Sequence, residues 1–87
     1  SEETSPAREM ARVRVTINTD PWSTWVLGGD AQGAGSHTPY LGNLPPGNYA
    51  FTLVEPASGD THTMHLRIQG DEDSIGRCWS FAKNGPC

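Results

Sequence analysis

Apolar and polar residues alternate along several segments of the chain. In residues 11–18 the alternation separates Val13, Val15 and Ile17 from Arg12, Arg14 and Thr16. A period of two residues is typical of a β-strand with one buried face. The predicted strands cover residues 11–18, 22–27, 49–54, 61–69 and 76–81. In the third and fourth of these strands, the apolar side chains that share one face are Tyr49, Phe51, Leu53, Met64, Leu66 and Ile68.

Turn-forming residues separate these strands. Proline fixes φ and lacks an N–H, and glycine tolerates positive φ, so both interrupt a strand. Turns are expected at residues 18–21, 55–60 and 70–74, and a flexible loop at 31–39. Prolines, glycines and asparagines, which favour turns, are also frequent in residues 38–49. Within this stretch Leu44 is expected to anchor the chain in the core before the strand that begins at Tyr49. Replacement of Gly47 is expected to be damaging if its φ is positive and trivial if it is not.

Strands separated by short turns, without any helical period, are typical of an all-β sandwich. We expect a small β-sandwich, transthyretin- or immunoglobulin-like, of about five to seven short strands. The chain has 87 residues, enough for one domain, which is expected to span residues 11–87. Residues 1–10 carry little apolar content and are expected to form a disordered linker or tail.

The two cysteines, Cys78 and Cys87, are expected to form a disulfide that closes the domain. A core this small rarely supplies more than about 3–5 kcal/mol, so a covalent staple is expected. Closing a loop of about ten residues contributes roughly 2.5–3 kcal/mol. The alternative is a metal pair, but the spacing lacks the short Cys-x-x-Cys of zinc sites. A disulfide implies an oxidising compartment, either the periplasm or the cell exterior.

Charge and hydropathy exclude two classes of partner. Ten acidic residues against six basic ones give a formal net charge of −4. Nucleic-acid binding requires clustered lysine and arginine, so we expect no nucleic-acid partner. No run of 18 or more apolar residues is present, so this segment is expected not to insert into a membrane. The sequence also shows no signal peptide, and we expect either a removed leader or a piece of a longer protein.

The order of the turn signals indicates a family. The signals are Pro21-Trp22-Ser23-Thr24-Trp25-Val26, Gly28-Gly29, Gly35-Ser36-His37-Thr38-Pro39 and Leu44-Pro45-Pro46-Gly47-Asn48-Tyr49. This order, over roughly residues 13–68, resembles the PEGA family of bacterial extracytoplasmic modules. The motif positions are Pro21, Thr38, Pro39, Leu44, Pro46, Gly47 and Tyr49. The resemblance implies a β-sandwich without catalytic activity, often part of a larger membrane-anchored, surface-layer or kinase protein.

Aromatic and polar residues around the long loop are candidates for binding. They are Trp22, Trp25, Asp30, His37, Tyr40 and Asn43. An aromatic face can stack on a sugar ring while Asp30 or Asn43 binds its hydroxyls. Strand alternation sends Trp22 and Trp25 to opposite faces, so we expect at most one in the core. In the alternative interpretation the tryptophans simply fill a core that has few large residues.

Two acidic or histidine-containing groups are weaker candidates for metal sites. His62 and His65 lie near Asp60, but residues three apart on a strand face opposite sides. The run Asp71-Glu72-Asp73 lacks the glycine and the spaced glutamate of a calcium loop. We therefore expect no metal and no cofactor.

No catalytic motif such as Gly-x-Ser-x-Gly or a phosphate-binding loop is present, and we expect no enzymatic activity. Two function classes remain. The first is an extracytoplasmic interaction or assembly module of a larger envelope-associated protein, binding a protein partner by strand addition or by its loops. The alternative is a module that binds glycan or peptidoglycan through an exposed tryptophan and the glycine-rich loop. An exposed tryptophan beside polar groups would favour the alternative, and tryptophans that are all buried would favour the first class.

Overall fold

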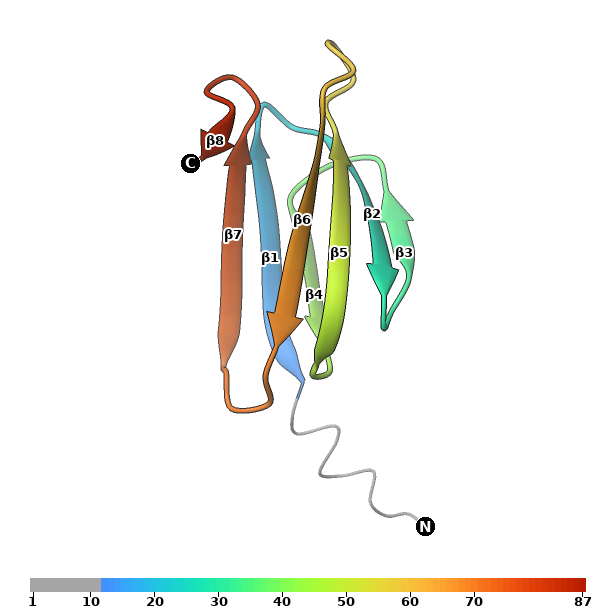
Figure 1. Ribbon diagram of the computed structural model, residues 1–87, viewed down its shortest axis with the longest axis vertical. Helices are drawn as coiled ribbons and strands as arrows, with labels where there is room; N and C mark the ends of the chain where they lie inside the picture. The colour runs from blue at the N-terminus through green and yellow to red at the C-terminus, as the bar shows by residue number, and fades with distance from the viewer. Residues whose placement is uncertain (1–11) are drawn as a thin grey trace.

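The computed structural model of the protein describes residues 12–87, which contain β-strands and no helix. Its eight strands form two four-stranded sheets that face each other as a small sandwich (Figure 1). The predicted all-β sandwich is confirmed, with more strands than the five to seven or so that were expected. The predicted tail at residues 1–10 lies outside the described residues.

The first sheet has the strand order β4-β1-β7-β8. Its central strand β1 (Val13–Asp20) pairs antiparallel with β4 (Tyr40–Leu44) and parallel with β7 (Ser74–Ser80). The short β8 (Gly85–Pro86) pairs with the last two residues of β7. β1 is therefore hydrogen-bonded along both edges, which places it in the middle of the sheet.

The second sheet has the order β3-β2-β5-β6, and all of its pairings are antiparallel. Its strands are β3 (Gly33–Gly35), β2 (Thr24–Gly29), β5 (Gly47–Val54) and β6 (Thr61–Ile68). The chain passes from one sheet to the other between β1 and β2, β3 and β4, β4 and β5, and β6 and β7. Hairpins within a sheet join β2 to β3, β5 to β6 and β7 to β8.

The core lies between the two sheets and is built mainly from β1 and β5. Both strands bury every second side chain, as their alternation predicts. The buried apolar residues are Val13, Val15, Ile17, Leu27, Leu44, Tyr49, Phe51, Leu53, Leu66, Ile68 and Ile75. In β6, Met64 is half-buried and packs against this cluster. The predicted inward faces of the first, third and fourth expected strands are thus confirmed.

Tyr49 closes the turn between β4 and β5. Its ring is buried, and its hydroxyl donates a hydrogen bond to the backbone carbonyl oxygen of Pro45 at 2.5 Å. A tyrosine bonded to backbone a few residues upstream also occurs at corners of immunoglobulin sandwiches. Burial, with a smaller contribution from the charge of Asp30, raises the pKa of Tyr49. Leu44 is buried beside this turn, which confirms its predicted role as an anchor.

Two strands occupy segments that were expected to be turn or loop. β4 lies in the turn-rich stretch and is held by pairing with β1, from Ile17↔Tyr40 to Val13↔Leu44. β3 lies within the expected flexible loop at residues 31–39 and pairs with β2. The indole of Trp25 lies so close to β3 that a Cβ at Gly35 would overlap it. The prediction of a loop was wrong there because pairing with β2 and the cover of Trp25 stabilise a strand that has little propensity of its own.

Strand boundaries also shift from those expected. β1 continues to Asp20 because β7 pairs with it as far as Asp20↔Ser80, so the predicted turn at residues 18–21 begins only at Pro21. β2 begins at Thr24, and Trp22 therefore precedes the strand rather than belonging to it.

Cys78 and Cys87 form the predicted disulfide, with their Cα atoms 5.3 Å apart. The bridge fastens β8 and Cys87 to β7, where the N–H of Cys87 also donates to the carbonyl oxygen of Cys78 at 3.3 Å. Restriction of the unfolded chain by a loop of this length stabilises the fold by roughly 2.5–3 kcal/mol.

The last two residues of β2, Gly28 and Gly29, differ in their surroundings. Gly29 has a φ of 103°, and a Cβ there would overlap the carbonyl oxygen of Asn48. A Cβ at Gly28 would meet no atom within 4 Å. Only the second position therefore requires glycine.

We expect Gly29→Ala to lower the free energy of unfolding by about 1–3 kcal/mol, because alanine is strained at positive φ and the Asn48 carbonyl must move. Gly28→Ala is the matched control and should change that free energy by less than about 0.5 kcal/mol. Urea unfolding followed by tryptophan fluorescence measures both variants. An equal loss of unfolding free energy in the two variants would contradict the conclusion that only Gly29 has a positive φ and a close backbone contact.

Candidate functional site

Four connections between strands lie at the same end of the sandwich. They join β1 to β2, β3 to β4, β5 to β6 and β7 to β8, and they form the upper end in Figure 1. The other three connections lie at the opposite end. Loops held by a rigid scaffold are where binding residues concentrate. We call the end with four connections the loop end.

Three buried hydroxyl groups join the first two connections of the loop end. Thr19 is the penultimate residue of β1, Ser23 precedes β2 and Thr38 precedes β4, and each is at most 8% exposed. Thr19 Oγ1 lies 2.6 Å from Thr38 Oγ1 and donates to Ser23 Oγ at 3.2 Å. The Ser23 N–H donates to Thr38 Oγ1 at 3.1 Å, and the Thr38 N–H donates to the Ser23 carbonyl at 2.8 Å. Satisfied buried networks rigidify a structure, so this hydroxyl cluster fixes the residues beside it.

Trp22 and His37 are the residues directly before Ser23 and Thr38. Their rings stack, with centroids 4.0 Å apart and an interplanar angle of 18°. Trp22 nevertheless stays 46% exposed. The hydroxyl cluster therefore carries an exposed aromatic pair at a fixed position, and the structure brings together two of the six predicted binding residues.

Trp25 and Tyr40 pack against the core instead. Their rings meet edge to face with centroids 4.7 Å apart, and the Tyr40 ring lies 5.0 Å from that of Phe51. Burial raises the pKa of Tyr40. The expectation that at most one of Trp22 and Trp25 belongs to the core is confirmed. The turn before β2, rather than alternation along a strand, directs Trp22 outward.

Asp30 and Asn43 do not lie beside the aromatic pair. The six residues of β2 separate Trp22 from Asp30; at about 3.3 Å per residue such a strand spans roughly 20 Å. Asn43 pairs with Arg14 near the end of β4 that is remote from His37. The polar groups that were expected to bind sugar hydroxyls next to tryptophan are thus at the other end of the sandwich.

Asp30 has a structural role at that opposite end. Its Oδ2 accepts the N–H of Asn48 at 2.8 Å, and its own N–H donates to the Asn48 carbonyl at 3.0 Å. A Cβ at Gly47 would lie 2.6 Å from the same Oδ2. Gly47 has no positive φ, so the close approach of Asp30, rather than backbone strain, accounts for glycine at this position.

The carboxylate of Glu55 orders the connection between β5 and β6. Glu55 is 8% exposed, and its Oε1 accepts both the hydroxyl of Ser58 at 2.5 Å and the N–H of Ser58 at 3.2 Å. Its Oε2 accepts the N–H of Ala57 at 2.9 Å. The Ser58 hydroxyl bond, followed by the Ala57 N–H bond, holds the pKa of Glu55 below its ordinary value. An ionised Glu55 therefore stabilises this loop.

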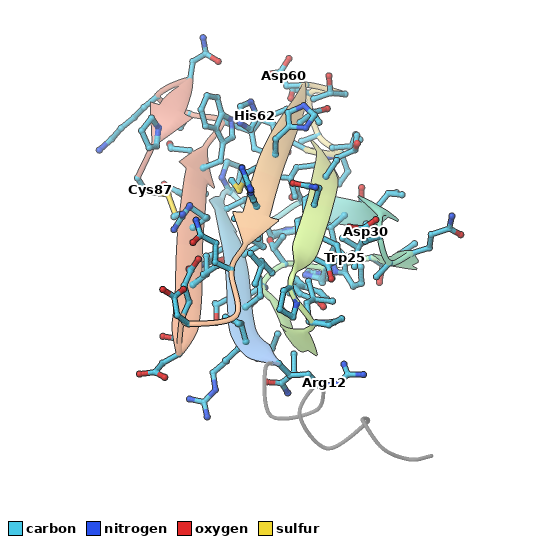
Figure 2. The ribbon with its side chains drawn as sticks, turned by 60° about the horizontal axis from the view of Figure 1, so that its bottom comes forward. Arg12, Trp25, Asp30, Asp60, His62 and Cys87 are labelled. Atoms are coloured by element: carbon cyan, nitrogen blue, oxygen red, sulfur yellow. A yellow bond between two sulfur atoms is a disulfide. The ribbon has the colours of Figure 1, made fainter. Side chains whose placement is uncertain are left out.

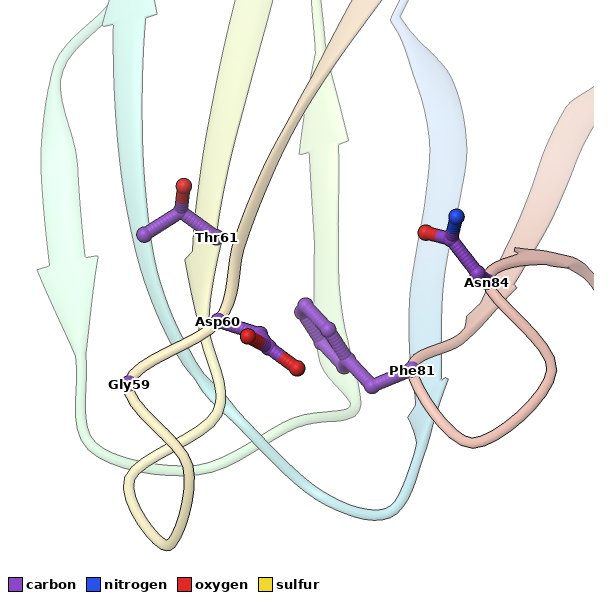
Figure 3. A pocket seen from close by; sticks show the side chains of 5 residues that line it. All are labelled: Gly59, Asp60, Thr61, Phe81 and Asn84. Carbon is purple, nitrogen blue, oxygen red and sulfur yellow. The ribbon is translucent and has the colours of Figure 1, made fainter.

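A hollow of about 500 Å³ opens at the loop end between the β5–β6 and β7–β8 connections (Figure 3). Its lining residues are Gly59, Asp60, Thr61, Phe81 and Asn84. The N–H of Phe81 donates to the carbonyl oxygen of Asp20 at 2.8 Å, which fixes one wall to β1. Asn84 has a φ of 56°, a conformation that asparagine tolerates in turns. We call this feature the loop-end hollow.

The histidines of β6 face opposite sides of the strand, as their spacing predicts. The ring of His62 stacks on Trp79 of β7, with centroids 3.5 Å apart and an interplanar angle of 4°, and Figure 2 shows His62 at the start of β6. His65 is exposed on the outer face. Within residues 12–87 no group of three His, Cys, Asp or Glu side chains is arranged to hold a metal ion.

The residues of the loop-end hollow were not identified as a group from the sequence. Phe81 was assigned to a strand, and Asp60 was considered only with the histidines. The alternating direction of successive strands is the signal that could have found them, because it places every second connection at the same end of the sandwich. This signal is unaffected when β3 and β4 are read as loop, since two missing strands leave the direction of the later strands unchanged.

Comparison of the chain with protein-family models, with curated proteins and with solved structures yields no match. The resemblance to the PEGA family therefore remains a prediction from the turn motifs. The described residues include no helix with the length and apolar character needed to cross a membrane.

The lowered pKa of Glu55 predicts acid-sensitive stability. The unfolded state takes up a proton near the ordinary carboxyl value, whereas the folded state resists it, so this contribution is present above that value and is lost as the pH falls through the lowered folded pKa. Glu55→Gln should be less stable at pH 7, and its deficit should shrink below about pH 4.5. Urea unfolding over a pH series measures this; a deficit that stays constant would contradict the role of the ionised carboxylate.

The exposed Trp22 predicts one readily quenched fluorophore among the three tryptophans. Trp25 and Trp79 are both half-buried and packed on other rings, so iodide should quench Trp22 most strongly. Trp22→Phe should remove most of the quenchable emission, while Trp25→Phe should leave it. A similar quenching constant before and after removal of Trp22 would show that another tryptophan is exposed.

Proposed function

We propose that this domain is a non-catalytic, extracytoplasmic interaction module that docks a protein partner on its loop end. The exposed pair of Trp22 and His37, fixed by the buried hydroxyl cluster, is the observation that supports the proposal. Tryptophan is among the residues most enriched at the energetic centres of protein interfaces. An anchor that is already held in place loses little side-chain entropy when a partner binds.

The geometry of this pair favours a protein over a glycan as its partner. One face of the Trp22 indole is already covered by the His37 ring at 4.0 Å. The polar residues predicted to bind sugar hydroxyls, Asp30 and Asn43, belong to the opposite end of the sandwich. A protein side chain can pack against the exposed part of the pair without such hydroxyl partners.

The loops are also better placed for docking than the edge of the second sheet. β6 pairs with β5 along one side only, which makes it a candidate for strand addition. Trp79 of β7 lies against His62 at the start of β6, so the margin between the sheets is partly covered there. Trp22 at the loop end, in contrast, is 46% exposed and open to a partner.

The proposed location is the periplasm or the outside of a bacterial cell, within a larger envelope-associated protein. The disulfide between Cys78 and Cys87 supports an oxidising compartment. The bacterial source and the larger protein rest on the resemblance to the PEGA family. The proposed absence of catalysis rests on the lack of a recognisable catalytic motif.

Site-specific photocrosslinking in the cells that produce the protein tests the docking surface. Benzoylphenylalanine in place of Trp22 should yield a protease-sensitive adduct with one defined partner. The control position is Leu41, which is 71% exposed on the outer face of the first sheet. His37→Ala should weaken the crosslink by loosening the orientation of the neighbouring ring.

Two outcomes would contradict the proposal. Equal adducts from positions 22 and 41 would show that the loop end has no preference for the partner. An adduct that is removed by glycan-degrading enzymes and resists protease would instead favour the alternative function, a glycan-binding module.

A further inference from the structure

We propose that the loop-end hollow is a binding site for one pyranose ring of a glycan. This site is separate from the Trp22–His37 pair and does not depend on the protein-docking proposal. Its walls come from two hairpin connections, residues 55–60 between β5 and β6 and residues 81–84 between β7 and β8. A volume of about 500 Å³ lies within the range of small-ligand pockets.

The lining combines the groups that a sugar ring requires. Phe81 supplies an aromatic surface for the apolar C–H face of a pyranose. Asp60 offers acceptor oxygens, and the amide of Asn84 can both donate and accept. Figure 3 shows the Asp60 carboxylate directed toward the wall that carries Phe81 and Asn84, whereas the Thr61 side chain points away from it.

The Asp60 carboxylate is not needed to hold its own loop. The N–H of Asp60 donates to Ser58 Oγ at 3.1 Å, and its carbonyl oxygen accepts the N–H of Glu55 at 2.9 Å. Backbone groups therefore place this residue, and the carboxylate is left for a ligand. A charged acceptor makes a stronger hydrogen bond to a sugar hydroxyl than a neutral one.

Both walls of the hollow are ordered without a ligand. Glu55 fixes the first wall through its bonds to Ala57 and Ser58. Ser80 Oγ accepts the N–H of Lys83 at 3.1 Å and shapes the second wall. Because little ordering remains to be done on binding, a weak ligand such as a single sugar ring can be retained.

A basic side chain of a protein is the competing occupant, since Asp60 would attract it. Ammonium and guanidinium groups only donate hydrogen bonds. They would leave the donor capacity of the Asn84 amide unused, whereas sugar hydroxyls both donate and accept. The mixture of donors and acceptors around Phe81 therefore favours the sugar.

Titration of the ¹⁵N-labelled 87-residue chain with N-acetylglucosamine, glucose and galactose, followed by NMR, tests the proposal. At least one sugar should shift the amide signals of Asp60, Thr61, Phe81 and Asn84 in a saturable way, with a Kd of about 1–10 mM. Asn84→Gly keeps the positive φ and removes the amide, so it should weaken binding about fivefold or more. Asp71→Asn, in the connection at the opposite end, is the control and should leave the Kd unchanged.

Absence of saturable shifts with all three sugars up to about 50 mM would overturn the proposal. It would also be overturned if ethylguanidinium alone produced these shifts and lost them in Asp60→Asn or at high salt, because that result identifies a site for basic side chains. Trp22→Phe should leave sugar binding unchanged. Failure of the photocrosslinking experiment therefore has no bearing on this site.

Discussion

The rest of the structure depends on two rows of side chains that meet between the sheets. Val13, Val15 and Ile17 of β1 face a second row that includes Phe51 and Leu53 of β5, and all five are fully buried. Because side chains alternate along a strand, a slip of one residue in either register would turn a whole row to solvent. The two rows therefore fix the strand registers, and the registers determine which residues reach the loop end.

Hydrogen bonding rather than apolar packing orders the loop end itself. Thr19, Ser23 and Thr38 satisfy one another and the adjoining backbone in a region that is almost closed to solvent. A buried hydroxyl that lost its partner would be left unsatisfied at considerable cost, so the three groups stabilise a single arrangement. Trp22 and His37 take their positions from this arrangement because each directly precedes one of its members. The position of the exposed Trp22–His37 pair therefore depends on the buried hydroxyl cluster.

How far the sequence predicted the structure depended on whether a segment had its own local pattern. β1 and β5 alternate strictly, and their buried faces were predicted correctly. β3 and β4 contain glycines and form through pairing with β2 and β1, partners that are distant in sequence in the case of β4. Omitting these two strands leaves the direction of the later strands unchanged, but it removes the crossing that carries His37 to the end of the sandwich where Trp22 lies. Asp30 follows β2 and Trp22 precedes it, so the predicted strand itself separates them. The hollow that joins Asp60 to Phe81 was not foreseen, because its two walls are distant in sequence.

The two candidate sites at the loop end differ in how they are attached to the core. The connections that carry Trp22 and His37 cross between the sheets and are tied together by the hydroxyl cluster. The walls of the loop-end hollow are hairpins within their sheets, and each is ordered chiefly by its own residues, through Glu55 in one and Ser80 in the other. The N–H of Phe81 also donates to the carbonyl oxygen of Asp20, which ties the second wall to β1. Both candidate sites are therefore ordered before a ligand binds, the aromatic pair by the hydroxyl cluster and the hollow by bonds within its two hairpins.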